Sequence, residues 1–283
     1  MPIHEYRRSA TFPRFDPSVP HPARIYGYWL GGKDHYPADR EAAEEVIARR
    51  PQVVAGARAN RAFLARVVRY LADECGIRQF IDIGTGLPAP GNTHDVAQAV
   101  AADSRIVYVD NDPLVLTYAR ALLTSSPQGS CDYIDADLRD TPTILAEAAG
   151  TLDFTRPTAV LMLAVLHFIP DTDDPGGIVA ALARQLAPGS YLAISHLTGD
   201  FAPDPVGAGV SAYNALVPTA LIPRTHSRVS ALFAGLPLVP PGVVPLTEWR
   251  PAPVGPSPWS SDMYAGVARA PGAALSPHQS RAA

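Results

Sequence analysis

The chain has 283 residues, of which 47% are hydrophobic, and a formal net charge of −4 at pH 7. This length and composition allow one large α/β domain with additions. The acidic balance excludes the extended basic surface of a nucleic-acid-binding domain.

The number of cysteines and the length of the apolar runs indicate the cellular compartment of the protein. Two cysteines are too few for a disulfide framework. The first ten residues carry Glu5, Arg7 and Arg8 in place of a signal peptide's apolar core. The longest uninterrupted apolar run, residues 159–166, is too short to span a bilayer. We therefore predict a cytoplasmic protein that binds neither nucleic acid nor membranes, and the histidine and cysteine spacing indicates no metal site.

Periodicity and proline content divide the chain into four parts. Residues 1–21 lack periodicity, and residues 271–283 follow the last apolar run, so both are expected to be flexible tails. Residues 22–76 form a predicted helical extension, with helices over 37–50 and 52–74. Residues 77–270 contain alternating strand and helix signals, which are typical of an α/β sheet domain.

The segment from Pro22 to Tyr36 is richer in aromatic residues than a linker needs. We interpret it as a lid over a ligand cleft, with Gly31 and Gly32 as a hinge. Its candidate acceptor contacts are Tyr26, Tyr28, Lys33 and Tyr36. Lys33 is the only lysine in the chain, so a compact ammonium is either required there or has survived a bias toward arginine by chance. The alternative for the whole segment is an aromatic staple that packs on the helices.

Asn60 is the polar exception in the apolar stripe of the helix predicted over 52–74. An amide that faces a core needs hydrogen-bonding partners. A neighbouring loop or a ligand would supply them, so Asn60 is a further candidate for the acceptor site.

A strand, a glycine turn and a helix follow one another between residues 78 and 100. Phe80, Ile81 and Ile83 give a short buried strand, and Gly84 and Gly86 break it into a tight turn. Asn92 is a predicted N-cap, with Asp95 three residues later. This is the first unit of a doubly wound α/β domain, which binds ligands at the carboxyl ends of its strands.

The turn fits the dinucleotide fingerprint only loosely, as Gly84-x-Gly86-x-x-Ala89. Pro88 and Pro90 prevent a helix from starting directly at the turn, so no helix N-terminus can receive a pyrophosphate there. Asp82 would also put a carboxylate beside that phosphate. A carboxylate suits a ligand with a cationic end, and Asp-x-Gly-x-Gly resembles the first motif of Rossmann-like methyltransferases that use S-adenosylmethionine. A nicotinamide oxidoreductase is the disfavoured alternative.

Polar residues recur where later strands end. Asp110 ends the strand over 105–110, at the position where such folds hydrogen-bond adenosine ribose hydroxyls; alternatively, Asp110 or Asp112 only caps the next helix. Asp137, His167 and His196 follow the predicted strands over 131–135, 157–166 and 191–195. Two closing strands are predicted over 236–246 and 263–267, which gives seven strands, mostly parallel with an antiparallel last strand, and helices on both faces.

Several motifs together resemble a bacterial family of S-adenosylmethionine-dependent methyltransferases of unassigned substrate. They are Pro-Ala-Arg-Ile-Tyr, Gly-Gly-Lys-Asp-His-Tyr, Ala59-Asn-Arg-Ala-Phe63, Asp-Ile-Gly-Thr-Gly-Leu-Pro, Tyr-Val-Asp-Asn-Asp-Pro and Val-Leu-His-Phe-Ile-Pro. The resemblance covers about residues 20–270 and implies a class I Rossmann-like fold. It also implies that Asp137-Leu138 meets the adenine amino group. The candidate cofactor contacts are Asp82, Gly84, Thr85, Gly86, Asp110, Asn111, Asp137 and Leu138.

The predicted reaction is in-line transfer of the sulfonium methyl group to a small-molecule acceptor, with the acceptor itself left open. His167 would remove a proton if the nucleophile needs it, or it would only hydrogen-bond the backbone. The alternative from another class is a non-catalytic protein that binds S-adenosylmethionine or S-adenosylhomocysteine and regulates a partner.

Overall fold

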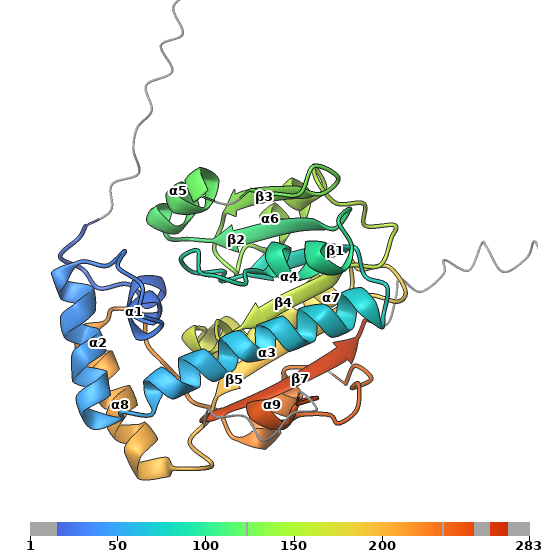
Figure 1. Cartoon of the computed structure of the whole chain (residues 1–283). Helices are drawn as coiled ribbons and strands as arrows, with labels where there is room; N and C mark the ends of the chain where they lie inside the picture. The colour runs from blue at the N-terminus through green and yellow to red at the C-terminus, as the bar shows by residue number, and fades with distance from the viewer. Residues whose placement is uncertain (1–15, 123, 234, 252–260, 271–283) are drawn as a thin grey trace, which may run out of the picture.

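The computed structural model describes residues 16–122, 124–233, 235–251 and 261–270. Its centre is one seven-stranded sheet with the order β3-β2-β1-β4-β5-β7-β6 (Figure 1). The strands are β1 Gln79–Ile83, β2 Arg105–Asp110, β3 Ser130–Asp135, β4 Ala159–Leu163, β5 Tyr191–Leu197, β6 Val244–Pro245 and β7 Met263–Arg269. β1 to β5 are mutually parallel, and β7 pairs antiparallel with β5 and β6. The predicted fold class is confirmed.

The closing pair of strands differs from the prediction in its first member. The strand expected over 236–246 is reduced to the two residues of β6 and one isolated bridge between Leu238 and Ala268. Pro237, Pro240 and Pro241 lack backbone N–H donors, so this stretch cannot form a continuous ladder with β7.

Helices cover both faces of the sheet. They are α1 Pro22–Trp29, α2 Pro37–Arg49, α3 Val53–Asp73, α4 Thr93–Val100, α5 Pro113–Leu122, α6 Thr141–Ala148, α7 Pro175–Ala183, α8 Pro203–Leu216 and α9 His226–Ala231. α3 and α4 bury their apolar stripes on one face, while α6, α7 and α9 cover the other. The central strands β1 and β4 are therefore buried at every residue, which suits the wholly apolar β4 and leaves Gln79 and Asp82 of β1 as buried polar groups.

α1, α2 and α8 form a separate group at one end of the sheet (Figure 1). A third hydrophobic cluster holds them together, in which Ile25 of α1 and Val46 of α2 are buried with Tyr213 of α8. The packing thus divides the chain differently from the sequence boundary at residue 76. α3 belongs to the layer on the sheet, whereas α8, from the C-terminal half, joins the N-terminal helices.

The two predicted tails fall mostly outside the described residues, which exclude 1–15 and 271–283. His21, assigned to the first tail, is an exception because it is half-buried and its backbone N–H donates to Asp39 Oδ1 at 2.9 Å. The structured chain therefore includes residues before α1. Among the described helices, none is long and apolar enough to cross a membrane.

Candidate active site at the sheet edge

A cavity of about 270 Å³ lies at the carboxyl ends of the parallel strands. One part of its wall comes from the turns after these strands, and the other part comes from α1, α2, α3 and α8. Eleven of the predicted site residues line it: Tyr26, Asn60, Asp82, Gly84, Thr85, Gly86, Asp110, Asn111, Asp137, Leu138 and His167. Most of the site residues predicted from the sequence therefore lie together around this cavity.

The two glycines of the turn after β1 have different requirements. Both have positive φ, +72° at Gly84 and +67° at Gly86. A Cβ on Gly84 would lie 2.5 Å from Val165 Cγ2, so this residue must lack a side chain to let the turns after β1 and β4 meet. A Cβ on Gly86 would meet nothing within 4 Å. The turn therefore leaves open space beside Gly86, where a ligand can approach the backbone.

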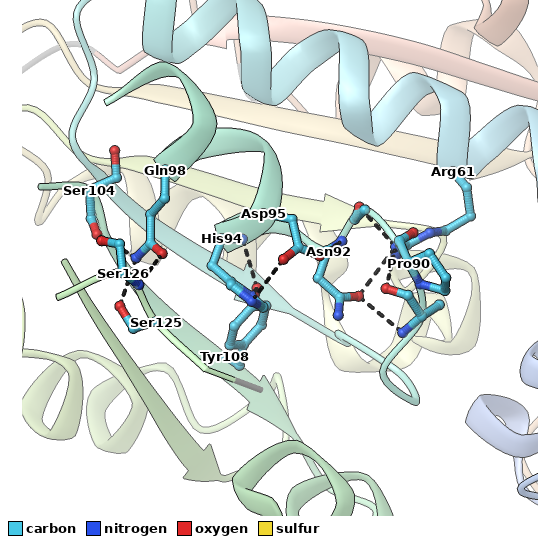
Figure 2. Close-up of polar contacts among 12 residues, drawn as sticks. Arg61, Pro90, Asn92, His94, Asp95, Gln98, Ser104, Tyr108, Ser125 and Ser126 are labelled. Atoms are coloured by element: carbon cyan, nitrogen blue, oxygen red, sulfur yellow. Dashed lines mark hydrogen bonds and ion pairs between the residues drawn. The ribbon is translucent and has the colours of Figure 1, made fainter. Parts of the chain in front are cut away.

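Arg61 of α3 fixes the loop between the glycine turn and α4 (Figure 2). Its Nη2 lies 3.1 Å from the Pro90 carbonyl oxygen, 2.9 Å from that of Gly91 and 3.2 Å from Asn92 Oδ1. Asn92 caps α4 as predicted, and its own backbone N–H donates to Asp95 Oδ2 at 2.9 Å. Arg61 was not among the predicted site residues, although the Ala59-Asn-Arg-Ala-Phe63 motif contained it.

Asp82 is a buried carboxylate within β1. Its Oδ2 accepts a hydrogen bond from Thr93 Oγ1 at 2.6 Å, which ties β1 to the N-terminus of α4. Burial raises the pKa of Asp82 to about 6, and the negative charge of Asp110 adds to this, while the Thr93 hydroxyl and the Arg61 charge oppose it. A cation bound in the cavity would relieve this cost, because an opposite charge nearby favours the ionised carboxylate.

Asp110, the last residue of β2, braces the glycine turn. Its Oδ2 accepts the Gly86 backbone N–H at 2.8 Å, and its Oδ1 accepts the Asp112 backbone N–H at 3.0 Å. Burial raises the pKa of Asp110. Asp112 instead accepts the Leu114 backbone N–H at 2.9 Å, at the start of α5. Of the two acids, Asp112 is thus the one that caps the helix, and Asp110 faces the cavity.

Asp137 lies after β3 and is held by its neighbour Arg139. Arg139 Nε and Nη2 donate to the two carboxylate oxygens at 2.8 and 2.7 Å. These hydrogen bonds lower the pKa of Asp137. Asn111 Nδ2 lies 3.4 Å from Asp137 Oδ2, and Leu138 is buried beside it. Asn111, Asp137 and Arg139 thus form a polar rim on the part of the cavity wall that follows β2 and β3, and Leu138 adds an apolar side chain to it.

His167 lies in the turn after β4 and is buried. Its Nδ1 accepts the Leu197 backbone N–H at 3.4 Å. Since an amide can only donate, the ring proton must be on Nε2. Burial lowers the pKa of His167 well below its usual value, with the neighbouring His196 and Arg224 acting in the same direction. The imidazole is therefore neutral and is a hydrogen-bond donor at Nε2, which makes it a poor general base.

His196 differs from the prediction, because it lies inside β5 and is fully buried instead of following the strand. Arg224 Nη1 donates to its Nε2 at 2.8 Å, and burial lowers its pKa to about 4. Arg224 also donates to the Leu166 and Ile169 carbonyl oxygens at 3.0 and 2.7 Å. This buried arginine, which sequence reasoning missed, holds the turn that carries His167.

Asn60 connects three elements around the cavity. Its Oδ1 accepts a hydrogen bond from Ser195 Oγ of β5 at 2.7 Å, and its Nδ2 donates to the Tyr26 hydroxyl of α1 at 3.1 Å. Tyr26 in turn donates to the Ala57 carbonyl oxygen at 3.0 Å. Both ends of the amide therefore have protein partners, which favours the bracing role over direct ligand contact.

Three of the predicted acceptor residues do not line the cavity. The Tyr28 hydroxyl donates to Glu44 Oε1 at 2.9 Å. Lys33 is exposed in the turn after α1. Tyr36 precedes α2 and donates its backbone N–H to Asp39 Oδ2 at 2.8 Å. Trp29 Nε1 also donates to the Ala43 carbonyl oxygen of α2 at 3.3 Å, so the end of α1 packs on α2 while Tyr26 and Trp29 line the cavity.

Comparison with known proteins identifies the family. A family model described as S-adenosyl methyltransferase matches residues 8–271. The chain belongs to this family. It is an S-adenosylmethionine-dependent methyltransferase, which decides against the nicotinamide and non-catalytic alternatives. No curated protein matches the chain.

Two solved structures are similar to this methyltransferase over most of its length. One is a DUF574 family protein from Streptomyces avermitilis MA-4680, with 46% identity and a TM-score of 0.88, which covers 91% of this chain and 100% of that one. The other, proposed to be a methyltransferase, is from Thermobifida fusca YX, with 39% identity and a TM-score of 0.81, and it covers 91% of this chain and 96% of that one.

Across the part of the methyltransferase that the structure describes, no cluster of three or more histidine, cysteine or acidic side chains could hold a metal ion.

Proposed function

We propose that this methyltransferase acts on a small-molecule acceptor by in-line transfer, with the cofactor at the turn-lined end of the cavity and the acceptor under α1, α2 and α8. The observation that carries the proposal is the continuity of the cavity from Asp110 and Gly86 at the sheet edge to Tyr213 of α8. A single continuous space would align two reactants, and closure over it would exclude water.

The residues at the turn-lined end fit S-adenosylmethionine. Three carboxylates line this end, and the cofactor carries a sulfonium and an ammonium. Asp110 has oxygens suited to the ribose hydroxyls, and Asp82 lies where it would offset the ammonium. Asn111, Asp137 and Leu138 would hold the adenine, and Gly84, Thr85 and Gly86 would supply the backbone surface. When bound, the cofactor supplies a methyl group that is already activated.

His167 would contribute a hydrogen bond and not a proton-accepting site. Its Nδ1 is occupied by the Leu197 backbone N–H, so its Nε2–H is free to orient an oxygen or nitrogen of the acceptor. The methyl group sits on an already activated sulfonium, so a neutral amine can attack it directly and lose its proton to solvent afterwards, whereas a hydroxyl nucleophile would release its proton to solvent as the new O–C bond forms and the S–C bond breaks. His167 is thus proposed to position the acceptor.

α1 is proposed to close over the cavity. Pro22, Ala23, Tyr26 and Trp29 all line it, and Arg24 anchors the helix through Asp39 and Asp112, at 3.3 and 3.4 Å. Binding should therefore slow hydrogen exchange in α1 more than in α9, which packs on one face of the sheet and does not line the cavity. Equal protection of both helices would count against a lid.

Calorimetry and a turnover assay test the proposal. The purified protein should bind S-adenosylmethionine and S-adenosylhomocysteine but not NAD. In a lysate of the host, it should convert S-adenosylmethionine to S-adenosylhomocysteine, and His167→Gln, which retains a donor, should keep more of this turnover than His167→Phe. Binding of NAD alone would refute the cofactor assignment. Equal loss in both variants, with a turnover that rises with pH in the wild type only, would restore His167 as the base.

A further inference from the structure

Three arginines of the described chain line the cavity, and two of them are paired with carboxylates. Arg50 pairs with Asp262, and Arg139 pairs with Asp137. Arg61 of α3 has no ion-pair partner among the residues that the structure describes. It is also half-buried, so its charge is partly removed from water without a protein carboxylate to balance it.

The hydrogen bonds of Arg61 all use one nitrogen, which holds the loop before α4 (Figure 2). Nη2 lies 3.5, 3.1 and 2.9 Å from the carbonyl oxygens of residues 89, 90 and 91, and 3.2 Å from Asn92 Oδ1. A guanidinium has five N–H donors, of which Nε and Nη1 carry three. Those donors have no partner within the described chain, and neither nitrogen is sealed from solvent. Because Arg61 lines the cavity, they are available to a ligand there.

Asp82 supplies the opposite charge at the same end of the cavity. Its Oδ2 accepts a hydrogen bond from the hydroxyl of Thr93, the residue that follows Asn92, so the start of α4 fixes both charged groups. Burial raises the pKa of Asp82 to about 6, and the Arg61 charge opposes that rise. The two groups are therefore close enough to interact without forming an ion pair. A wall with both charges suits a ligand that carries both.

We propose that Arg61 binds the carboxylate of the cofactor's amino-acid portion, while Asp82 offsets the ammonium on the same carbon. The inference rests on the proposed function, which puts the cofactor at the turn-lined end of the cavity. In S-adenosylmethionine one carbon carries both charged groups, so a single ligand meets both side chains. A contact between a guanidinium and a carboxylate is charge-assisted and stronger than a neutral hydrogen bond.

The other cations of the cavity wall do not offer the same contact. Arg50 and Arg139 already have carboxylate partners, so a ligand carboxylate at either arginine would also meet an aspartate. At Arg61 it would meet unused donors. Without Arg61, the cofactor's carboxylate would lie beside Asp82 with no cation to balance it.

Two thioethers of adenosine test this assignment by calorimetry on the full chain. S-adenosylhomocysteine carries both charged groups, and its decarboxylated analogue, an aminopropyl thioether, keeps only the ammonium. The wild type should bind S-adenosylhomocysteine about ten- to hundredfold more tightly, the range for hydrogen bonds to charged groups. Arg61→Gln, which keeps an amide donor for the loop but no charge, should reduce this preference to less than about threefold. Arg61→Lys, which keeps the charge, should retain part of it.

Two control variants separate ligand binding from bracing of the loop. Arg58→Gln removes a guanidinium from the same helix at a residue that does not line the cavity, so it should keep the full preference. Asn92→Ala loosens the loop and leaves the guanidinium in place, so it should lower the melting temperature and also keep the preference.

The outcomes distinguish this inference from the proposed function. If Arg61 only braces the loop, Arg61→Gln weakens both ligands by the same factor, and the unchanged preference overturns the inference. A wild type that binds both ligands equally overturns it too, even if the variants do not fold, and leaves the cofactor assignment intact. If neither ligand binds the wild type, the cofactor assignment fails and the inference fails with it.

Discussion

The two ends of the cavity are built in different ways. At the sheet edge, Asp82, Asp110 and Asp137 each lie in or directly after a strand, and short stretches of sequence hold them. At the acceptor end, α2 and α8 come from opposite halves of the chain and meet through apolar side chains. At the sheet edge, the backbone of the strands and turns sets the positions of the carboxylates. At the acceptor end, the packing of the helices sets the shape of the cavity. A family can therefore keep one cofactor and change its acceptor by altering the helices.

The largest effect should come from the glycine turn. Gly84→Ala adds backbone strain at positive φ, about 1–2 kcal/mol, and a collision with Val165 that costs about 1–3 kcal/mol more. We expect urea denaturation to show a loss of roughly 2–5 kcal/mol in the free energy of unfolding. Gly86→Ala, which meets open space, should show only the strain.

Gly209 of α8 gives the matching control at the acceptor end. A Cβ there would lie 3.2 Å from Arg50 Cβ, and alanine is favoured over glycine in a helix by about 1 kcal/mol. Gly209→Ala should therefore change stability by less than about 1 kcal/mol. A loss as large as that of Gly84→Ala would show that the acceptor end is no more tolerant than the sheet edge.

Asp110→Ala should weaken S-adenosylhomocysteine binding by roughly 1–3 kcal/mol, the usual cost of losing hydrogen bonds to a charged group. The variant also loses the two hydrogen bonds that Asp110 accepts from the Gly86 and Asp112 backbone N–H groups, so some loss of stability should accompany the loss of affinity. Asp112→Ala removes the α5 cap and a partner of Arg24, so it should lower the melting temperature with little change in affinity. Calorimetry and thermal denaturation separate the two effects, and an unchanged affinity for the Asp110 variant would refute the ribose assignment.

The smallest effect is a pH dependence set by Asp82. Its pKa of about 6 lies above the ordinary value of 3.8, so the folded apo protein binds a proton more readily than the unfolded chain. This group should therefore stabilise the apo protein as pH falls through 6. Cofactor affinity should move the opposite way, because the ammonium favours ionised Asp82; between pH 7 and 5 it should fall by up to roughly tenfold.

Asp82→Asn tests the assignment. Asp110 faces the same carboxylate, has its own pKa raised by burial and remains in the variant, so any pH dependence that survives would belong to it. We expect calorimetry on Asp82→Asn to give a nearly flat affinity profile over this range. A profile as steep as that of the wild type would assign the titration to another group.

Local signals made the sheet edge predictable. The apolar run before Gly84, the proline break after it and the Asn92 cap depend on neighbouring residues, and each appears in the structure as the sequence indicated. β6 is shorter than the strand that the apolar pattern over 236–246 predicts, because the prolines within this stretch interrupt the hydrogen-bond ladder.

The sequence by itself determined the fold class, the glycine turn at the sheet edge and the order of the acids along it, because strands, turns and caps are set by residues close in the chain. The tertiary structure alone decided which tyrosines reach the cavity, since Tyr26 and Tyr28 are two residues apart on one helix, and only Tyr26 meets Asn60 and the cavity. It also decided the tautomer of His167, through the Leu197 backbone N–H, and left the Tyr213 hydroxyl without a partner among the residues that the structure describes. These properties depend on partners far apart in the chain, which no local pattern encodes.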